Sequence, residues 1–303
     1  MSADPGISPT ASGYSIGDPG RAGIEVRPTV VTLPAAWPDT VADAISLPSA
    51  EIRAASVRGI LHRDYGTPRQ DCYAVSGDRD GIVVAVCDGV GSLPLSHQAA
   101  YRASVTAVAA VRRHTRDDQV HWAAVFAEVS DDLRDLEHSL QVAESEQQRL
   151  LATTVLLGML RPSADANWQL ELAWHGDSAP FLLRRNSDWV AIDPQVLEID
   201  EATGLVASVG NATRALPSRQ PAQFKSVTLA ARPGDAAFLM TDGVGKPMGG
   251  GAGPVGRALA DWWREPPPML TFADHVGFAR RGYTDDRTVV GVWFRSPEPV
   301  AEP

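Results

Sequence analysis

Short apolar runs separated by turn-forming residues recur along most of the chain. The most regular example is a pair of runs at residues 72–75 and 82–87, joined by the Gly- and Asp-rich stretch 76–81, which predicts a β-hairpin. The second run is apolar at every position, which is typical of a strand buried on both faces. The same kind of pattern predicts further strands at residues 57–61, 152–160, 168–174, 180–184, 189–192, 225–229, 236–240 and 288–294.

Two stretches have the composition and spacing of long helices. Residues 97–114 carry small alanine side chains that suit close packing on a sheet, and Ser96 is the expected N-cap. Beyond Gln119, large apolar residues recur every three or four positions as far as Leu140, which indicates the buried stripe of an amphipathic helix. Shorter helices are expected near residues 255–263 and 272–280.

The two ends of the chain lack this periodicity. Residues 1–50 are rich in Pro, Gly, Ala and Ser, and we expect a disordered or loosely packed extension there, with a short strand at 29–33. Residues 51–296 are expected to form one folded domain, followed by a frayed tail at 297–303. Within the domain, residues 193–221 have a mixed pattern and are predicted to be irregular.

Composition narrows the classes of function. The net charge of −10 and the isoelectric point of about 5.1 oppose a nucleic-acid-binding surface, which needs a basic patch. Phosphorylated substrates are not opposed, because bound metal ions can reverse the local sign of charge. Cys72 and Cys87 fall in the predicted hairpin and are expected to be reduced core thiols. Every apolar run is shorter than the ~18 residues of a membrane span, and no basic, apolar leader is present, so a cytoplasmic protein is expected.

Aspartates stand at the ends of several predicted strands. Asp71 precedes the hairpin and Asp88 follows it, so antiparallel pairing brings both to the same end of the sheet. Two carboxylates at one edge repel each other unless a cation or a proton separates them, and Mg²⁺ and Mn²⁺ prefer such oxygen ligands. Strand ends also carry Asp177, Asp242 and Asp285. Aspartate is common in turns, so the joint pattern, rather than any single residue, indicates a metal site.

Six motifs, five of which contain one of these aspartates, follow one another along residues 57–294: R-Q-D-C-Y-A-V, V-A-V-C-D-G-V-G-S, L-A-T-T-V-L-L, H-G-D-S-A-P-F, R-P-G-D-A-A-F-L-M-T-D-G-V and T-D-D-R-T-V-V. In this order the chain resembles the metal-dependent protein phosphatases of the protein phosphatase 2C family, and the Q-D of the first motif is similar to the compact bacterial-type branch. The resemblance implies an α+β fold, a four-layer αββα sandwich with two central antiparallel sheets flanked by helices.

The resemblance also implies a role for each matching residue. Asp88 bridges two ions, Mg²⁺ or Mn²⁺, and the Gly89 carbonyl ligates one of them. Asp242 and Asp285 hold the other ion, so Asp88, Asp242 and Asp285 form the implied catalytic set. Asp71 helps to hold the second ion, directly or through water.

Two more positions bear on metal binding. Asp177 matches an aspartate that can hold a weaker third ion. Gln70 stands where many members of the family use a glutamate ligand, which implies weaker binding at the second site.

The chain departs from the family pattern in two places that touch substrate. Gly66 is near the place of an arginine that grips the substrate phosphate in many members, and Val90 stands where some members carry a histidine that protonates the leaving group. Candidates to bind the phosphate instead are Arg69, Arg63 and His62, and candidates for the proton donor are His62 and His97. Each candidate for phosphate binding is equally well explained as a solvated loop residue, and a surface or structural role is the better explanation for His62 and His97 as proton donors.

The expected function is that of a phosphoserine/phosphothreonine protein phosphatase, in which metal-activated water attacks the phosphate monoester in line. The alternatives are a weakly active or inactive relative that binds phosphoproteins as a regulatory module, and a small-molecule phosphoesterase. The intact set Asp88, Asp242 and Asp285 argues against a decayed site. The expected partners are a phosphorylated protein substrate and a cognate Ser/Thr kinase, with no nucleic acid and no membrane, and the protein is expected to be a monomer.

Overall fold

The computed structural model of the chain describes residues 7–10, 13–20, 37–78, 80–140, 150–163, 165–186, 188–192, 214–218 and 223–296. The strand predicted at 29–33, the tail at 297–303 and most of the excursion at 193–221 lie outside these residues.

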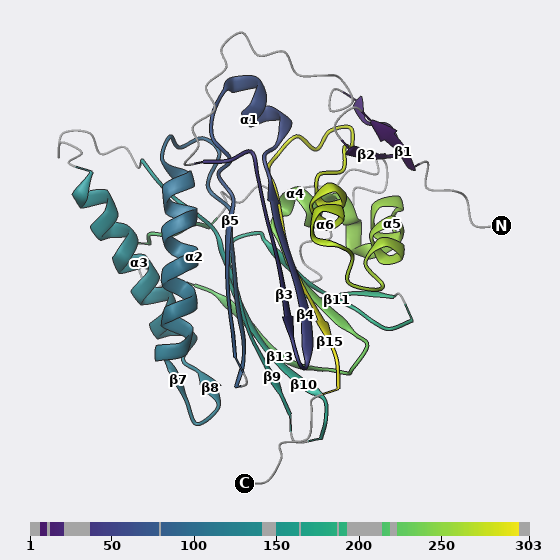
Figure 1. Cartoon of the computed structure of the whole chain (residues 1–303). Coiled ribbons are helices and arrows are strands. Elements are labelled where there is room, and N and C mark those ends of the chain that lie inside the picture. The colour runs from purple at the N-terminus through teal and green to yellow at the C-terminus, as the bar shows by residue number, and fades with distance from the viewer. Residues whose placement is uncertain are drawn as a thin grey trace.

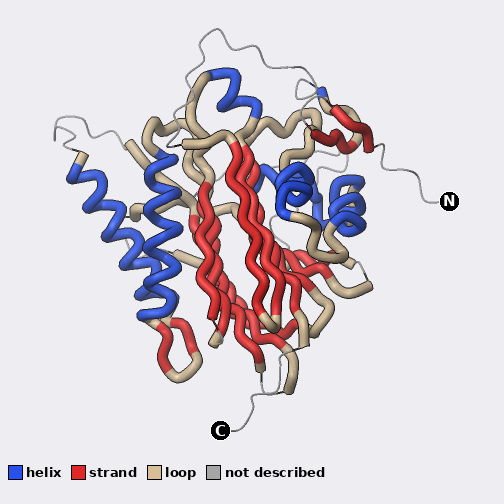
Figure 2. The backbone as a smooth tube through the Cα atoms, in the orientation of Figure 1, coloured by secondary structure: helices blue, strands red, loops and turns tan. Residues whose placement is uncertain are grey.

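Two antiparallel sheets form the centre of the molecule (Figures 1 and 2). The five-stranded sheet has the order β13 (Lys225–Ala231), β10 (Trp168–His175), β9 (Val155–Pro162), β6 (Gly81–Cys87) and β5 (Cys72–Asp78). The six-stranded sheet has the order β12 (Trp189–Ala191), β11 (Ala179–Leu183), β14 (Ala236–Met240), β15 (Arg287–Phe294), β4 (Ala50–Val57) and β3 (Thr40–Leu47).

Helices cover the outer face of each sheet (Figure 1). The helices α2 (Ser96–Arg113) and α3 (Trp122–Ser139) lie on the five-stranded sheet and are joined by the small hairpin of β7 (Thr115–Arg116) and β8 (Gln119–Val120). The helices α4 (Asp242–Met248), α5 (Pro254–Trp262) and α6 (Met269–Val276) lie on the six-stranded sheet. Among the described residues, no helix combines the length and the apolar character needed to cross a bilayer.

Three apolar cores bind these four layers together. One lies between α2, α3 and the five-stranded sheet, one between the two sheets, and one between the six-stranded sheet and α4 to α6. The strand β6 serves two of the cores, because Val84 and Val86 face the other sheet while Val83 and Ala85 face α2. The predicted αββα sandwich, and the prediction that this strand is buried on both faces, are confirmed.

The structure corrects the predicted extension at residues 1–50. The domain boundary predicted at residue 51 falls inside a sheet, because β3 pairs with β4 from Thr40 to Leu47. Farther upstream, β1 (Ile7–Thr10) and β2 (Gly13–Ile16) form a hairpin. The side chain of Ile16 is fully buried in the core that contains α5 and α6. The strand β3 was not predicted from the sequence, because it is a half-exposed edge strand built largely from small residues.

Two local predictions were also wrong. The strand predicted at 57–61 is the end of β4 followed by the helix α1 (Ile60–Tyr65), since Gly59 separates the two elements. Ser96 is not the N-cap of α2; Leu95 holds that position, and the Ser96 hydroxyl instead donates a hydrogen bond to the Val90 carbonyl. That bond ties the start of α2 to the loop that follows Asp88.

Candidate metal centre

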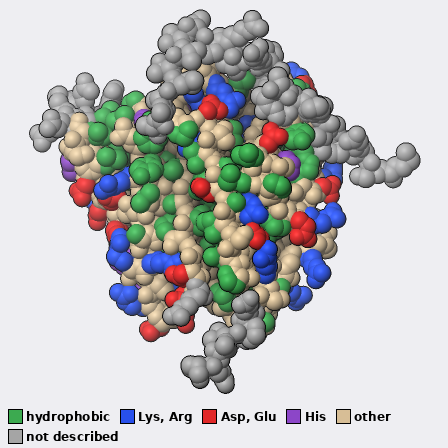
Figure 3. All heavy atoms as spheres, in the orientation of Figure 1, with side chains coloured by type: hydrophobic (Ala, Val, Ile, Leu, Met, Phe, Trp, Pro, Cys, Tyr) green, Lys and Arg blue, Asp and Glu red, His purple; other side chains and the backbone are tan. Residues whose placement is uncertain are grey.

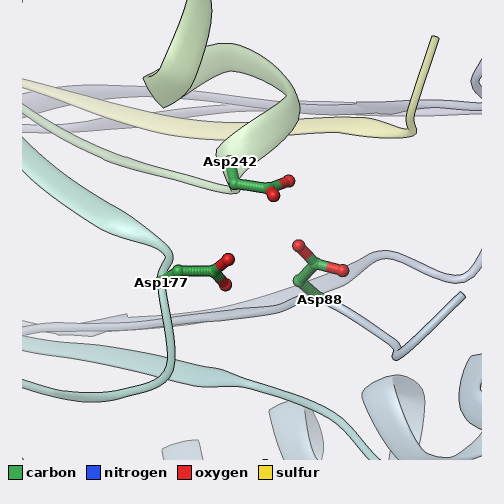
Figure 4. Close-up of side chains that lie close together, drawn as sticks. All are labelled: Asp88, Asp177 and Asp242. Carbon is green, nitrogen blue, oxygen red and sulfur yellow. The ribbon is translucent and has the colours of Figure 1, made fainter. Parts of the chain in front are cut away.

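Three aspartates from different strands converge at one end of the sandwich (Figure 4). Asp88 follows β6, Asp177 joins β10 to β11, and Asp242 opens α4 directly after β14. One carboxylate oxygen from each lies within 4.8 Å of the others. The antiparallel pairing described above produces this convergence, because it returns each strand end to the same edge.

The remaining predicted ligands, Asp71 and Asp285, lie outside this group of three but interact electrostatically with Asp88. Both contribute charges that raise the pKa of Asp88. Asp71 immediately precedes β5 and is almost completely buried, and one of its carboxylate oxygens accepts a hydrogen bond from the Thr241 hydroxyl at 2.8 Å. Asp285 stands two residues before β15. All five predicted aspartates therefore belong to one electrostatic cluster.

The cluster is strained electrostatically in the absence of a cation. Burial raises the pKa of Asp88 and of Asp71 well above the usual range, and the neighbouring carboxylates raise both further. Burial, followed by Asp242 and Asp286, raises the pKa of Asp285 to about 6. Among the described residues, no side chain or backbone N–H donates a hydrogen bond to the Asp88 carboxylate.

Two glycines allow the loops to approach this cluster. A Cβ placed on Gly89 would lie 2.7 Å from the carbonyl oxygen of Gln70, and one placed on Gly243 would overlap the carbonyl oxygen of Asp286. Any side chain at either position would push the aspartate-bearing loops apart. The glycine after Asp88 and the glycine after Asp242 are therefore required by packing as well as by access to a ligand.

Asp286, the second aspartate of its motif, has a structural role that the sequence did not reveal. Its carboxylate accepts hydrogen bonds from the backbone N–H groups of Gly59 and Gln70, at 2.6 and 2.5 Å. It also forms an ion pair with His62, with 2.9 Å between the imidazole Nδ1 and the carboxylate. These contacts fasten the loop that carries Asp71 to the start of β15.

The three residues predicted to bind the phosphate all have protein partners. Arg69 is buried and donates hydrogen bonds to the backbone carbonyls of Ser56 and Asp71. Arg63 forms a bidentate ion pair with Asp39. Burial lowers the pKa of His62, but its contact with Asp286, together with the charges of Asp286 and Asp285, outweighs burial and leaves that pKa raised. Their predicted role in phosphate binding stays a prediction.

Sequence reasoning also missed Lys246. Its ammonium forms ion pairs with the carboxylates of Asp177, at 3.3 Å, and of Asp242. The signal was the spacing of four residues between Asp242 and Lys246, which places both on one face of a helix. No helix was predicted over this segment, which contains Gly245 and Pro247, whereas it forms α4.

The residues present fit divalent cations of the hard, oxygen-binding type. The group of Asp88, Asp177 and Asp242 supplies converging carboxylate oxygens, and their mutual repulsion is the kind that a cation relieves. The Oε1 atom of Gln70 is buried and has no hydrogen-bond partner among the described residues. A buried polar atom of this kind calls for a water molecule or an ion.

A four-layer sandwich with this acidic cluster at the end of its sheets is the arrangement that the resemblance to metal-dependent phosphatases predicts. The sequence model of the family described as Protein phosphatase 2C matches residues 58–270. The chain therefore belongs to the protein phosphatase 2C family, whose members are metal-dependent phosphoprotein phosphatases. This finding confirms the family, the class of enzyme and the dependence on Mg²⁺ or Mn²⁺ predicted from the motifs.

Solved structures of bacterial phosphatases share the fold. The catalytic domain of the serine/threonine protein phosphatase PstP, in complex with two manganese ions, is 20% identical with a TM-score of 0.56, and the match covers 82% of this chain and 99% of that one. PppA, a regulatory component of the type VI secretion system of Pseudomonas aeruginosa, is 19% identical with a TM-score of 0.53 over 83% and 100%. MsPP from Mycobacterium smegmatis, in complex with cacodylate, is 20% identical with a TM-score of 0.51 over 82% and 100%.

No curated protein sequence gives a significant match to the chain.

Proposed function

We propose that this protein removes phosphate from phosphoserine and phosphothreonine side chains, with Asp88, Asp242 and Asp285 as its catalytic carboxylates. The observation that carries the proposal is the convergence of partly buried, mutually repelling aspartates from separate strand ends. Asp88, Asp177 and Asp242 lie within the residues that the family model matches.

The chain's own residues divide between two neighbouring ion positions. Asp88, Asp242 and Asp285 would hold one ion. Asp88, the Gly89 carbonyl and Asp71 would hold the other, with Asp71 oriented by its bond to Thr241. Bound divalent cations supply an activated water and neutralise charge on the phosphoryl oxygens. The protein keeps the carboxylates ionised and close together once those cations are bound, and Asp286 fixes the loop on which Asp71 lies.

Substrate preference distinguishes this proposal from its rivals. The preserved carboxylates favour an enzyme over a phosphoprotein-binding module without activity. A small-molecule phosphoesterase would use the same centre, so the distinction depends on residues that recognise the peptide around the phosphate. A cognate kinase that places the phosphate, a monomeric state and a cytoplasmic location remain parts of the proposal.

A metal-dependent phosphatase assay tests the proposal. Hydrolysis of p-nitrophenyl phosphate is measured with Mn²⁺, with Mg²⁺ and with EDTA, followed by a panel of peptides carrying phosphoserine, phosphothreonine or phosphotyrosine and a panel of small phosphoesters. We expect activity that depends on the metal and favours phosphoserine and phosphothreonine peptides. Absence of activity with Mn²⁺ would support the binding module, and a preference for small phosphoesters would support the third alternative.

A further inference from the structure

Lys246 occupies one side of the acidic cluster. It lies one helical turn after Asp242 in α4, and its Nζ atom is 3.3 Å from Asp177 Oδ2 and also pairs with Asp242 Oδ2. One ammonium therefore joins two of the three carboxylates that converge in Figure 4. The contact to Asp242 uses Oδ2.

The ion pairs are partly shielded from water, so they are stronger than pairs at an open surface. The side chains of Lys246 and Asp177 are about one-third exposed, and that of Asp242 is 14% exposed. Although burial opposes the charged form, Asp242 and Asp177 raise the pKa of Lys246, so it is a cation throughout the physiological range. The charge of Lys246 in turn lowers the pKa of Asp177 and offsets part of the rise caused by burial and Asp242.

The position of Lys246 is set by the packing of α4. The helix begins at Asp242, whose neighbour Gly243 lies directly against the Asp286 backbone, and Gly245 packs against Ala179 and Phe181. These contacts fix the backbone from which the Lys246 side chain projects.

The type of cation is also informative. The chain has 27 basic residues, of which only Lys225 and Lys246 are lysines. An ammonium is a compact point charge, whereas a guanidinium is a broad planar fork. A compact charge suits the space between the carboxylates of Asp177 and Asp242. A single divalent cation would otherwise fill that space.

We propose that the Lys246 ammonium takes the place of a third divalent ion between Asp177 and Asp242, so that the chain binds two divalent ions and not three. The inference rests on the proposed function, because it concerns the same centre. It assigns Asp177 a lysine as its partner, in place of the weaker third ion that the family resemblance implies.

Counting bound ions tests the inference without measuring activity. The metal-free full chain is dialysed against Mn²⁺ to saturation, and manganese per chain is measured by mass spectrometry and by calorimetric titration. We expect two ions in the wild-type protein. Lys246→Met keeps the length of the side chain and removes the charge, so we expect a third ion in that variant.

Matched variants identify where the third ion binds. Lys225→Met carries the same substitution on the exposed strand β13 and is expected to bind two ions. Adding Asp177→Asn to Lys246→Met is expected to return the count to two. Asp177→Asn alone is expected to leave the wild-type count unchanged, and this variant provides the test if circular dichroism shows that Lys246→Met does not fold.

The outcomes separate the inference from the proposed function. Three ions in the wild-type protein, an unchanged count in a folded Lys246→Met, or the loss of an ion in Asp177→Asn alone would each overturn the role of Lys246 and leave a metal-dependent phosphatase intact. A wild-type chain that binds no manganese would overturn the proposed function itself.

Discussion

The two ends of the β-sandwich differ in how many hydrogen bonds their strand-end aspartates accept. At the end away from the metal centre, Asp235 stands in the turn before β14, and its carboxylate accepts hydrogen bonds from Arg184 Nη1 and from the backbone N–H groups of Arg185 and Arg232, at 2.8 to 3.1 Å. At the other end, no described residue donates to the carboxylate of Asp88, and its closest charged neighbours are further aspartates. Both residues are strand-end aspartates beside a glycine, so what distinguishes them is the supply of donors.

The same contrast occurs between two consecutive residues. Asp286 is held by Gly59, Gln70 and His62, whereas the carboxylate of Asp285 accepts only the backbone N–H of Asp286 among the described residues. A carboxylate that the protein satisfies stabilises the fold. One that the protein buries without donors lowers the stability of the metal-free fold, and it is available to a cation.

Charge on the visible surface does not show this division. On the face in Figure 3, basic and acidic side chains are interspersed and no single-sign patch dominates. The distinction between the two kinds of aspartate is made inside the molecule, by hydrogen bonds at the ends of strands.

The largest effect is expected from Asp88, whose carboxylate accepts no hydrogen bond from the described residues. Asp88→Asn removes charge from both ion positions, and we expect turnover in saturating Mn²⁺ to fall by ~10³-fold or more, or ~4 kcal/mol of transition-state stabilisation. In EDTA the variant should melt at the same temperature as the parent or higher, because repulsion in the cluster is reduced. A turnover within about tenfold of the parent would contradict the two-ion assignment, and loss of folding would make Asp88 a structural turn residue.

Asp286 and Asp285 allow a carboxylate with several hydrogen-bond partners to be compared with a neighbouring one that has a single such partner among the described residues. Asp286→Asn weakens a buried, charge-assisted set of contacts, and we expect the free energy of unfolding in EDTA to fall by roughly 2–4 kcal/mol. Asp285→Asn should cost no stability in EDTA but should abolish most of the metal-dependent activity. Chemical denaturation and turnover, measured on both variants, check the pair. Equal loss of stability in both would contradict the division.

Asp235 extends the comparison to the far end of the sandwich. Asp235→Ala leaves three donors without their acceptor, and we expect about 2 kcal/mol of lost stability. Turnover per folded molecule should match the wild type, since the metal centre lies at the opposite strand ends. Active-site titration combined with denaturant unfolding separates the two quantities. A change in the dependence of activity on Mn²⁺ would show that the two ends are coupled.

The smallest expected effect is a dependence on pH. The pKa of Asp285 is about 6 in the folded metal-free chain and 3.8 ordinarily, so between these values the folded state holds a proton that the unfolded state has released. This group therefore destabilises the metal-free fold at pH 7, and the effect fades as the pH falls through 6 towards 4. In EDTA, Asp285→Asn should melt a few degrees above the wild type at pH 7, and the gap should close on acidification. A gap that is constant with pH would contradict the raised pKa.

Much of the architecture could be predicted from periodicity. The strand β6 is almost entirely apolar, and the helices α2 and α3 are long with a regular buried stripe, so their sequence patterns match their structure. The strand β3 could not be predicted, because its edge position leaves half of its surface to solvent and so relaxes the pattern. The helix α4 could not be predicted either, since it contains two glycines and Pro247, and its Gly243 is required by the close approach of the Asp286 backbone.

The metal centre could be predicted only as a set of candidate ligands. Strand-end position pointed to the five aspartates, but it could not separate Asp285 from Asp286, because that difference depends on donors that arrive from residues 59 and 70. The pairing of Lys246 with Asp177 likewise joins a helix residue to a residue of the turn between β10 and β11, and it becomes visible only when α4 is placed against β11.

The contacts of β2 bear on how the chain folds. The Ile16 N–H donates to the Ala279 carbonyl, and Arg280 Nη1 donates to the Ile16 carbonyl across 264 positions of sequence. The strand β4 likewise pairs with β15, the last strand, whereas the five-stranded sheet is complete by Ala231. During synthesis the five-stranded sheet can form early, but the six-stranded sheet must wait until nearly the whole chain has left the ribosome. Until then the edge of β4 that pairs with β15 has no partner strand, and an unpaired strand edge of this kind is prone to aggregation.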